Sequence, residues 1–405
     1  MKKLKVLFVD DEPNVLSGLR RMLRGLRDQW EMEFLDSGEA AQHRMRETPF
    51  DVVVSDMRMP GIDGVSLLTH VLKEFPSTAR IILSGYADKA ALMRAVTPAH
   101  QFLSKPCNAD VLKSSIERTR KLQEMLKNDS LIQFVSSVTQ LPSLPNVYSE
   151  VVCELQNDSP SLDRITELIC SDVSMAAKVL QLVHSSFFGF RGRVESIRHA
   201  VVLLGICNLQ PLVLTGAVFS QFDHLVCDQF DVTGLFERSK KVNVLAERFA
   251  NQHSNDRAIL DDVRLASPML DVGKLVMIAG RPNEYNEAIE LSNSTGMYDY
   301  EAERAIFGVG HPEVGAYLLG LWGVPDSIVD AVAFHHEPHR SLHSGFSPLT
   351  ATYWADQFQS ARENKFTQMM DQSIDADYLI SAGIVDYKTE WCRWNMLELS
   401  ELAVN

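Results

Sequence analysis

One short stretch, residues 51–64, constrains the fold of this chain more than any other. It reads DVVVSDMRMPGIDG: the apolar run Val52–Val54 leads to Asp56, and the chain breaks soon afterwards at Pro60 and Gly61. Such a bounded apolar run predicts a buried strand of a parallel sheet, and ligands of these sheets collect beyond the carboxyl ends of the strands. Asp56 is therefore well placed for chemistry, with a structural aspartate that caps the next helix as the alternative.

Five apolar runs, counting this one, alternate with segments of helical period before residue 126. The runs are Val6–Val9, Glu33–Leu35, Val52–Val54, Ile81–Leu83 and Phe102–Leu103, of which Glu33–Leu35 is the weakest. This alternation predicts an α/β domain with a doubly wound, five-stranded parallel sheet.

Polar residues stand at the ends of four of these runs. Asp10 and Asp11 follow the first run, Asp56 ends the third, Ser84 the fourth and Lys105 the fifth. Carboxylates that converge at one edge repel one another and require a divalent cation, and hard oxygen ligands suit Mg²⁺. Together with a hydroxyl and an ammonium group, the set can hold a phosphoryl group on one of the acids.

This constellation resembles the receiver domain of two-component response regulators over residues 4–122. The resemblance implies that Asp56 is the phosphoacceptor. It also implies that Mg²⁺ is held by Asp10, Asp11, Asp56 and the backbone carbonyl of Arg58.

The same resemblance assigns the residues that respond to the phosphoryl group. Ser84 takes the place of the switch hydroxyl, Lys105 that of the lysine that pairs with the phosphoryl group, and Pro106 that of the family's cis-proline. The switch aromatic is Phe102, where many members have tyrosine. Phe102 can still move in and out, but it has no hydroxyl to anchor either position.

Residues 108–127 are predicted to form a long last helix of this domain. Its apolar stripe consists of Leu112, Ile116, Leu122 and Leu126. The first half of the stripe is expected to cover the sheet. The later positions are expected to face the second domain or a second chain, which makes this helix the predicted mechanical connector.

The composition changes at Asn128–Pro145, and almost everything after it has helical period without strand-like alternation. We therefore expect an all-α bundle. Several of its stretches resemble the HDOD family, a signalling relative of the HD metal-dependent phosphohydrolases: LPSLPNV, SDVSMAAKVLQLVHSSFFG, MLDVGKLV, HPEVGAYLLGLWGVP, AVAFHHEP and YWADQF.

The predicted domains are a receiver domain (1–122), a helical linker (123–140), an HDOD domain (141–340) and a helical C-terminal extension (341–405). Apolar residues of the extension are expected to pack back on the bundle, with a partner surface as the alternative: Trp391, Trp394, Leu397, Leu399 and Leu402.

An active HD site needs a first histidine, a His-Asp pair and a distal aspartate, because these ligands together hold a metal that generates hydroxide. The HDOD register places Arg238 at the first histidine and Leu270 at the histidine of the pair, and neither binds metal. The remnant consists of Asp271, His311, His335, His336 and Asp356.

In this domain we expect no cofactor and no hydrolysis. An ion pair from Arg238 to Asp271 or Asp356 is expected instead of a metal site. If that pair is buried, Asp271→Ala would lower stability by about 3 kcal/mol, because an arginine would be left unpaired.

Charge and cysteine content exclude several classes of function. The net charge of −14 argues against a strongly electrostatic binder of nucleic acid or anionic membranes. The six cysteines include no CxxC pair, so they indicate neither a zinc site nor a disulfide scaffold. The longest apolar stretch, Ala200–Val218, contains Asn208, Gln210 and Pro211, which favours core helices over a membrane span.

The sequence therefore predicts a cytoplasmic response regulator, a phosphoprotein of a two-component phosphorelay. A sensor histidine kinase or a phosphotransfer protein would phosphorylate the receiver, which would control a non-catalytic HDOD module that engages an unknown protein partner. The alternative is a metal-dependent phosphohydrolase or phosphodiesterase acting on a nucleotide or cyclic dinucleotide. A DNA-binding regulator ranks third, because no helix-turn-helix with a basic recognition face is evident. The oligomeric state, a homodimer included, stays open.

Overall fold

A computed structural model describes residues 3–84, 98–126, 129–138, 141–157, 159–184, 193–214, 219–221, 230–363 and 374–402. The chain divides into two compact units, each made of two segments. The first unit comprises Met1–Phe230 and Val272–Pro325, and the second comprises Asp231–Asp271 and Asp326–Asn405. Among the residues described, no helix combines the length and the apolar character needed to cross a bilayer.

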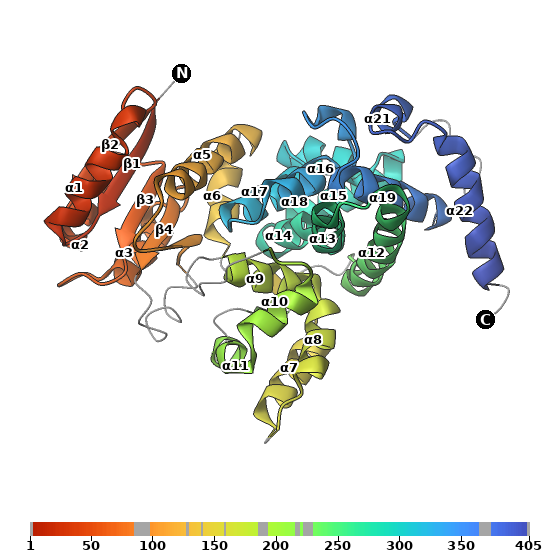
Figure 1. Cartoon of the computed structure of the whole chain (residues 1–405), viewed down its shortest axis with the longest axis horizontal. Helices are drawn as coiled ribbons and strands as arrows, with labels where there is room; N and C mark the ends of the chain where they lie inside the picture. The colour runs from red at the N-terminus through yellow and green to blue at the C-terminus, as the bar shows by residue number, and fades with distance from the viewer. Residues whose placement is uncertain are drawn as a thin grey trace. The chain divides into compact units, whose positions relative to one another are not determined.

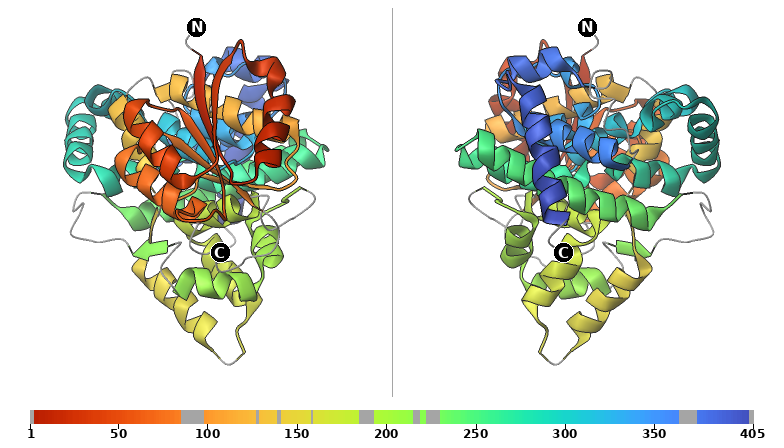
Figure 2. Two further views of the ribbon diagram at one scale, coloured as in Figure 1. Left: turned by 90° about the vertical axis from the view of Figure 1, so that its left-hand side faces the viewer. Right: turned by 90° about the vertical axis from the view of Figure 1, so that its right-hand side faces the viewer.

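The first unit opens with a five-stranded parallel sheet in the order β2-β1-β3-β4-β5. Figures 1 and 2 show helices on both sides of this sheet. Its elements are β1 Leu4–Val9, α1 Pro13–Met22, η1 Arg24–Leu26, β2 Trp30–Leu35, α2 Gly38–Glu47, β3 Val52–Asp56, α3 Gly64–Glu74, β4 Ala79–Ser84, β5 Gln101–Ser104 and α5 Ala109–Leu126.

The predicted doubly wound sheet is confirmed, and its central strands are apolar because helices cover both of their faces. Every residue of β3 and β4 is buried. Strand β2 lies at the edge, and only Trp30 of its six residues is buried. This placement explains why its apolar signal in the sequence is weak.

The rest of the first unit is almost entirely helical. Its elements are α6 Asp129–Ser137, β6 Leu141–Ser143, α7 Pro145–Gln156, α8 Leu162–Cys170, α9 Val173–His184, α10 Ile197–Leu204, α11 Ile206–Leu214, β7 Phe219–Gln221, α14 Val272–Gly280, α15 Pro282–Thr295, α16 Asp299–Phe307 and α17 His311–Leu321.

Two short strands depart from the expectation of helices alone. Strand β6 pairs in parallel with β7, with Leu141 opposite Phe219 and Ser143 opposite Gln221. The carboxylate of Asp172, which caps α9 by accepting from Met175 N at 2.9 Å, also accepts from Leu144 N at 2.9 Å. One buried aspartate thus ties the segment after β6 to the start of α9.

Helix α5 packs against α17 as well as against the sheet. Leu112 and Ile116 are fully buried, and Leu122 is buried beside Gly320 of α17. A Cβ atom on Gly320 would lie 2.6 Å from Leu122 Cδ1, so the two helices approach closely. The expectation that the later stripe positions face the second domain is therefore confirmed at Leu122, whereas the side chain of Leu126 lies outside the described residues.

The second unit is helical throughout its described residues. Its elements are α12 Val232–His253, α13 Arg257–Ala266, η3 Ser267–Met269, α18 Asp326–Phe334, η4 Pro338–Arg340, α19 Pro348–Glu363, α21 Ala376–Ser381 and α22 Tyr387–Leu402. Trp391 and Trp394 of α22 are buried and pack edge-on against Phe358 of α19, as predicted. The side chains of Leu397, Leu399 and Leu402 lie outside the described residues.

Candidate functional site

The acidic edge of the sheet forms where the parallel strands end. Asp10 follows β1, and Asp56 is the last residue of β3, its neighbour in the sheet. Both carboxyl groups are buried, with 1% and 7% of the residue exposed, and Asp11 beside them is half-buried. The topology of the sheet alone brings these acids together.

One lysine contacts two of these acids. Lys105 Nζ lies 2.7 Å from Asp10 Oδ2 and also forms an ion pair with Asp56 Oδ1. Lys105 N donates to the carbonyl of Ser84 at 2.8 Å, which fixes the backbone just before the cis peptide bond to Pro106. The other oxygen of Asp56, Oδ2, accepts from Arg58 N at 2.7 Å.

Burial and charge act on the protonation of this edge. Burial raises the pKa of the Asp56 carboxyl above its usual value, against the opposing effect of Lys105. Burial alone would lower the pKa of Lys105, but its hydrogen bonds to Asp10 and Asp56 outweigh that effect and raise the pKa. The lysine is thus a permanent cation at neutral pH.

Ser84 and Phe102 lie on the adjoining strands β4 and β5, and both are buried. Ser84 Oγ is 3.5 Å from the thioether sulfur of Met57, which is a weak acceptor. The Phe102 side chain is 3% exposed, so the ring occupies the inward position.

The edge also fits a magnesium ion. Asp10, Asp11 and Asp56 supply hard carboxylate oxygens, and Lys105 forms ion pairs with two of them, Asp10 and Asp56. Three carboxylates opposed by one ammonium group leave an excess of negative charge, which a divalent cation with oxygen ligands would neutralise.

A second cluster of charges lies in the second unit, around Arg238 of α12. Its guanidinium binds Asp271 Oδ2 at 3.4 Å, Asp356 Oδ1 at 2.8 Å and Glu363 Oε2 at 3.2 Å. The same group donates to Ser360 Oγ at 2.8 Å. The predicted ion pair from Arg238 to an acid of the HD remnant is therefore present, and it reaches Asp271 and Asp356 together.

Burial opposes the charge on Arg238, but Asp356 and Asp271 outweigh burial and raise the pKa of the guanidinium. Two of its partners, Ser360 and Glu363, were not predicted. They follow Asp356 on α19 by four and seven residues, a spacing that places all three on one face of a helix. That spacing was the signal available in the sequence.

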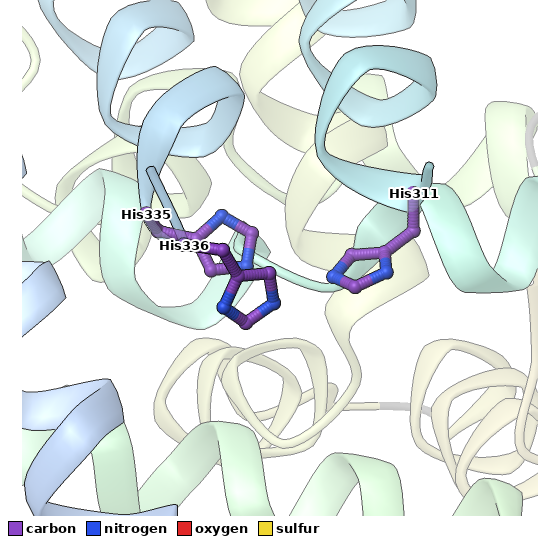
Figure 3. Close-up of side chains that lie close together, drawn as sticks. All are labelled: His311, His335 and His336. Carbon is purple, nitrogen blue, oxygen red and sulfur yellow. The ribbon is translucent and has the colours of Figure 1, made fainter. Parts of the chain in front are cut away.

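The remaining HD positions are distributed over both units. In the second unit, Leu270 is buried, and His335 and His336 follow α18 with ring centroids 4.0 Å apart. His336 Nδ1 lies 3.6 Å from Asp356 Oδ2. In the first unit, His311 is the first residue of α17; Figure 3 draws these three histidines and the helices that carry them.

His311 has a carboxylate partner that the sequence analysis did not identify. Its backbone N and its Nδ1 lie 2.6 and 2.7 Å from Glu303 Oε2, and both histidine and glutamate are buried. Tyr285 donates to the other carboxylate oxygen at 3.2 Å. The carboxylate therefore assigns the ring proton of His311 to Nδ1.

Comparison with known proteins adds two family matches. The model of the response regulator receiver domain matches residues 6–117, and the model of the HDOD domain matches residues 141–338. An uncharacterized protein of Treponema pallidum is 25% identical over 219 residues, which are 53% of this chain and 41% of that protein. The hydrogenase transcriptional regulatory protein HoxA of Cupriavidus necator is 32% identical over 124 residues, or 30% of this chain and 25% of that protein.

The chain thus spans less than half the length of these curated relatives. Among solved structures, the MmoQ response regulator from Methylococcus capsulatus is 18% identical, with a TM-score of 0.49. That match covers 62% of this chain and 96% of MmoQ.

Proposed function

This chain joins a response regulator receiver domain to an HDOD domain, and from that premise we propose that phosphorylation of Asp56 controls a non-catalytic HDOD module that engages a partner protein. A sensor histidine kinase or a phosphotransfer protein would supply the phosphoryl group. The observation that carries the proposal is the contact of Lys105 with both Asp10 and Asp56 at the carboxyl edge of the sheet.

The chemistry follows from these contacts. An oxygen of the Asp56 carboxylate attacks the donor's phosphorus, an acyl-phosphate P–O bond forms, and the donor's bond to phosphorus breaks as its leaving group takes a proton from water. Lys105 then pairs with the phosphoryl oxygens, and Ser84 turns its hydroxyl toward them. Bound Mg²⁺, held by Asp10, Asp11, Asp56 and the carbonyl of Arg58, would supply positive charge against the phosphoryl oxygens.

The non-catalytic part of the proposal rests on Arg238. A guanidinium held by Asp271 and Asp356 occupies the carboxylates that a metal would need, and its fixed charge opposes a divalent cation there. Leu270 supplies no donor. Hydrolysis of a phosphoester by a metal hydroxide therefore has no support at this position.

Incorporation of phosphate from a small-molecule donor, with and without Mg²⁺, tests the receiver. Wild type is expected to incorporate one phosphate only with Mg²⁺, and Asp56→Asn is expected to incorporate none. Asp63→Asn is the matched control, because Asp63 caps α3 and is expected to leave incorporation unchanged. Unchanged incorporation in Asp56→Asn would remove the assignment. Lys105→Ala is expected to be phosphorylated without the change in limited-proteolysis pattern that phosphorylated wild type shows.

Restoring the lost ligands tests the HD remnant. Arg238→His with Leu270→His returns two imidazoles beside Asp271 and Asp356, and the double variant is expected to bind about one divalent transition metal per chain. Each single variant serves as a control and is expected to bind less. The proposal fails if wild type itself holds stoichiometric iron, manganese or zinc and hydrolyses a nucleotide in a way that Asp271→Ala abolishes.

A further inference from the structure

Helix α17 has one end against the receiver domain and the other end at a residue of the HD remnant. It runs from His311 to Leu321, about 15 Å at the rise of an α-helix. All eleven of its residues are buried. A buried helix of this length moves as one body rather than bending, because its side chains are packed on every face.

At its C-terminal end, α17 is bound by two receiver side chains. Gln101 Nε2 of β5 donates to Leu321 O at 3.0 Å, and the Arg118 guanidinium of α5 donates to Val324 O at 2.8 Å. Carbonyls at the C-terminal end of a helix have no partner within the helix, so Gln101 holds the last turn. Arg118 holds the segment just after the helix, where Val324 N donates back to Leu319 O at 3.1 Å. One residue before the end of the helix, Gly320 admits Leu122 of α5 at close range.

At its N-terminal end, α17 begins with His311, whose backbone and ring contact Glu303 of α16. The same first turn is also fixed by Glu313, which accepts from Gly310 N at 3.1 Å and pairs with Arg304 at 2.6 Å. Displacement of α17 along its axis would therefore alter the contact between His311 and Glu303.

Strand β5 connects the C-terminal end of α17 to the acidic edge. Gln101 is its first residue, and Lys105, the partner of Asp10 and Asp56, follows its last. Phe102 lies between them. A cavity of about 150 Å³ lined by Phe102, Arg118, Trp322 and Gly323, among others, lies between β5, α5 and the end of α17. This space allows side chains of β5 to rearrange without collision.

We infer that α17 carries the phosphorylation signal from β5 to the pair of His311 and Glu303. The inference rests on the proposed function, because it takes phosphorylation of Asp56 as its input. When Lys105 transfers its contact from the carboxylates to a phosphoryl group, β5 shifts. The hydrogen bonds from Gln101 and Arg118 then move the C-terminal end of α17, and the rigid helix passes the shift to His311. Coupling of this kind requires a single packed element whose position is biased at both of its ends. The contacts at the two ends of α17 meet this requirement.

The experiment uses the full-length chain with ¹³C-labelled histidine rings, and beryllofluoride with Mg²⁺ as the mimic of the phosphoryl group. The ring signal of His311 is assigned with His311→Gln, and ¹⁹F signals report whether beryllofluoride is bound. In wild type, binding is expected to shift the His311 signal. Gln101→Leu with Arg118→Met is expected to reduce that shift at least twofold at full occupancy, and each single variant is expected to reduce it in part. Lys121→Met, an exposed position of α5, is the control and is expected to keep the full shift.

The outcomes separate this inference from the proposed function. Bound beryllofluoride with an unmoved His311 signal, or an equal shift in wild type and the double variant, would overturn the role of α17 while leaving phosphorylation of Asp56 in place. Absence of bound beryllofluoride in wild type, together with no incorporation of phosphate, would overturn both. If the double variant does not fold, the two single variants decide.

Discussion

At the scale of single residues, Arg238 shows how one substitution changes the character of a site. A guanidinium presents several N–H donors in a fixed plane, so one arginine binds Asp271, Asp356, Glu363 and Ser360 together. The acids do not contribute equally. Asp356 is 1% exposed and lies closest, whereas Asp271 is 3.4 Å away and Glu363 is 41% exposed at its side chain.

This geometry revises the cost expected for Asp271→Ala. The value of about 3 kcal/mol assumed that Arg238 would be left unpaired. Because Asp356 and Glu363 also bind the guanidinium, we now expect Asp271→Ala to lower the free energy of unfolding by only about 1 kcal/mol, and Asp356→Ala by about 3 kcal/mol. Urea unfolding of the two variants measures both values. Equal losses would contradict the ranking.

Lys178 of α9 gives a second prediction at this scale, through pH. The side chain is 1% exposed, with Nζ 4.7 Å from the ring centroid of Trp322, and burial lowers its pKa to about 7 from an ordinary 10.5. Between these values the unfolded chain holds a proton that the folded chain releases, so stability rises with pH from about 7 to 10.5. Below about pH 7 both states are protonated, and the lysine adds no further pH dependence.

Lys178→Met removes this titration. At pH 7 the variant is expected to be more stable than wild type by about 2–4 kcal/mol, and the difference is expected to vanish near pH 10.5. Lys113→Met, at a side chain 43% exposed, serves as the control and is expected to leave the pH dependence unchanged. Parallel stability curves for wild type and Lys178→Met between pH 7 and 10 would contradict the prediction.

At the scale of elements, the sequence predicted those parts whose signal is local. The strands around Val52–Val54 and Ile81–Leu83 were predictable because central parallel strands are continuously apolar. Strands β6 and β7 were not predictable. Each has three residues, too few to show alternation, and their pairing joins positions nearly eighty residues apart.

The same distinction holds for the sites. Asp10, Asp56 and Lys105 could be placed together from sequence because parallel topology fixes where strand ends meet. The spacing of Ser360 and Glu363 shows that they share a helix face with Asp356, but their contact with Arg238 depends on how α12 and α19 pack, which no local pattern encodes. The pairing of His311 with Glu303 depends in the same way on the packing of α16 and α17.

At the scale of the whole molecule, the first unit joins the receiver sheet to the helices that follow through buried Arg80 of β4. Its guanidinium donates to the carbonyls of Pro98 at 2.6 Å, Pro76 and Thr78 at 3.1 Å, and Ser136 at 2.6 Å. Ser136 lies in the last turn of α6, where helix carbonyls need outside donors. Its hydroxyl also contacts Tyr317 of α17 at 3.0 Å.

Replacing Arg80 is expected to loosen this junction. Arg80→Met leaves buried carbonyls without their donor, so the free energy of unfolding is expected to fall by about 3 kcal/mol. Limited proteolysis is expected to become faster between residues 123 and 140. Arg44→Met is the control, because Arg44 pairs with Glu33 near the surface, where ion pairs contribute little, and it is expected to cost far less than Arg80→Met. Equal losses in the two variants would show that Arg80 does not hold the junction.

The division of the chain into two interrupted units affects how it folds during synthesis. Helix α12 ends at His253, but α19, which binds Arg238, begins only at Pro348. Ribosomes add about 5–20 residues each second, so α12 waits roughly 5–20 s for α19 after it has been made. Throughout that interval Phe249 of α12, buried in the finished protein, stays without Trp354 of α19, against which its ring stacks. The nascent chain thus exposes the apolar face of an otherwise polar helix for seconds, a natural substrate for chaperones that bind before synthesis ends.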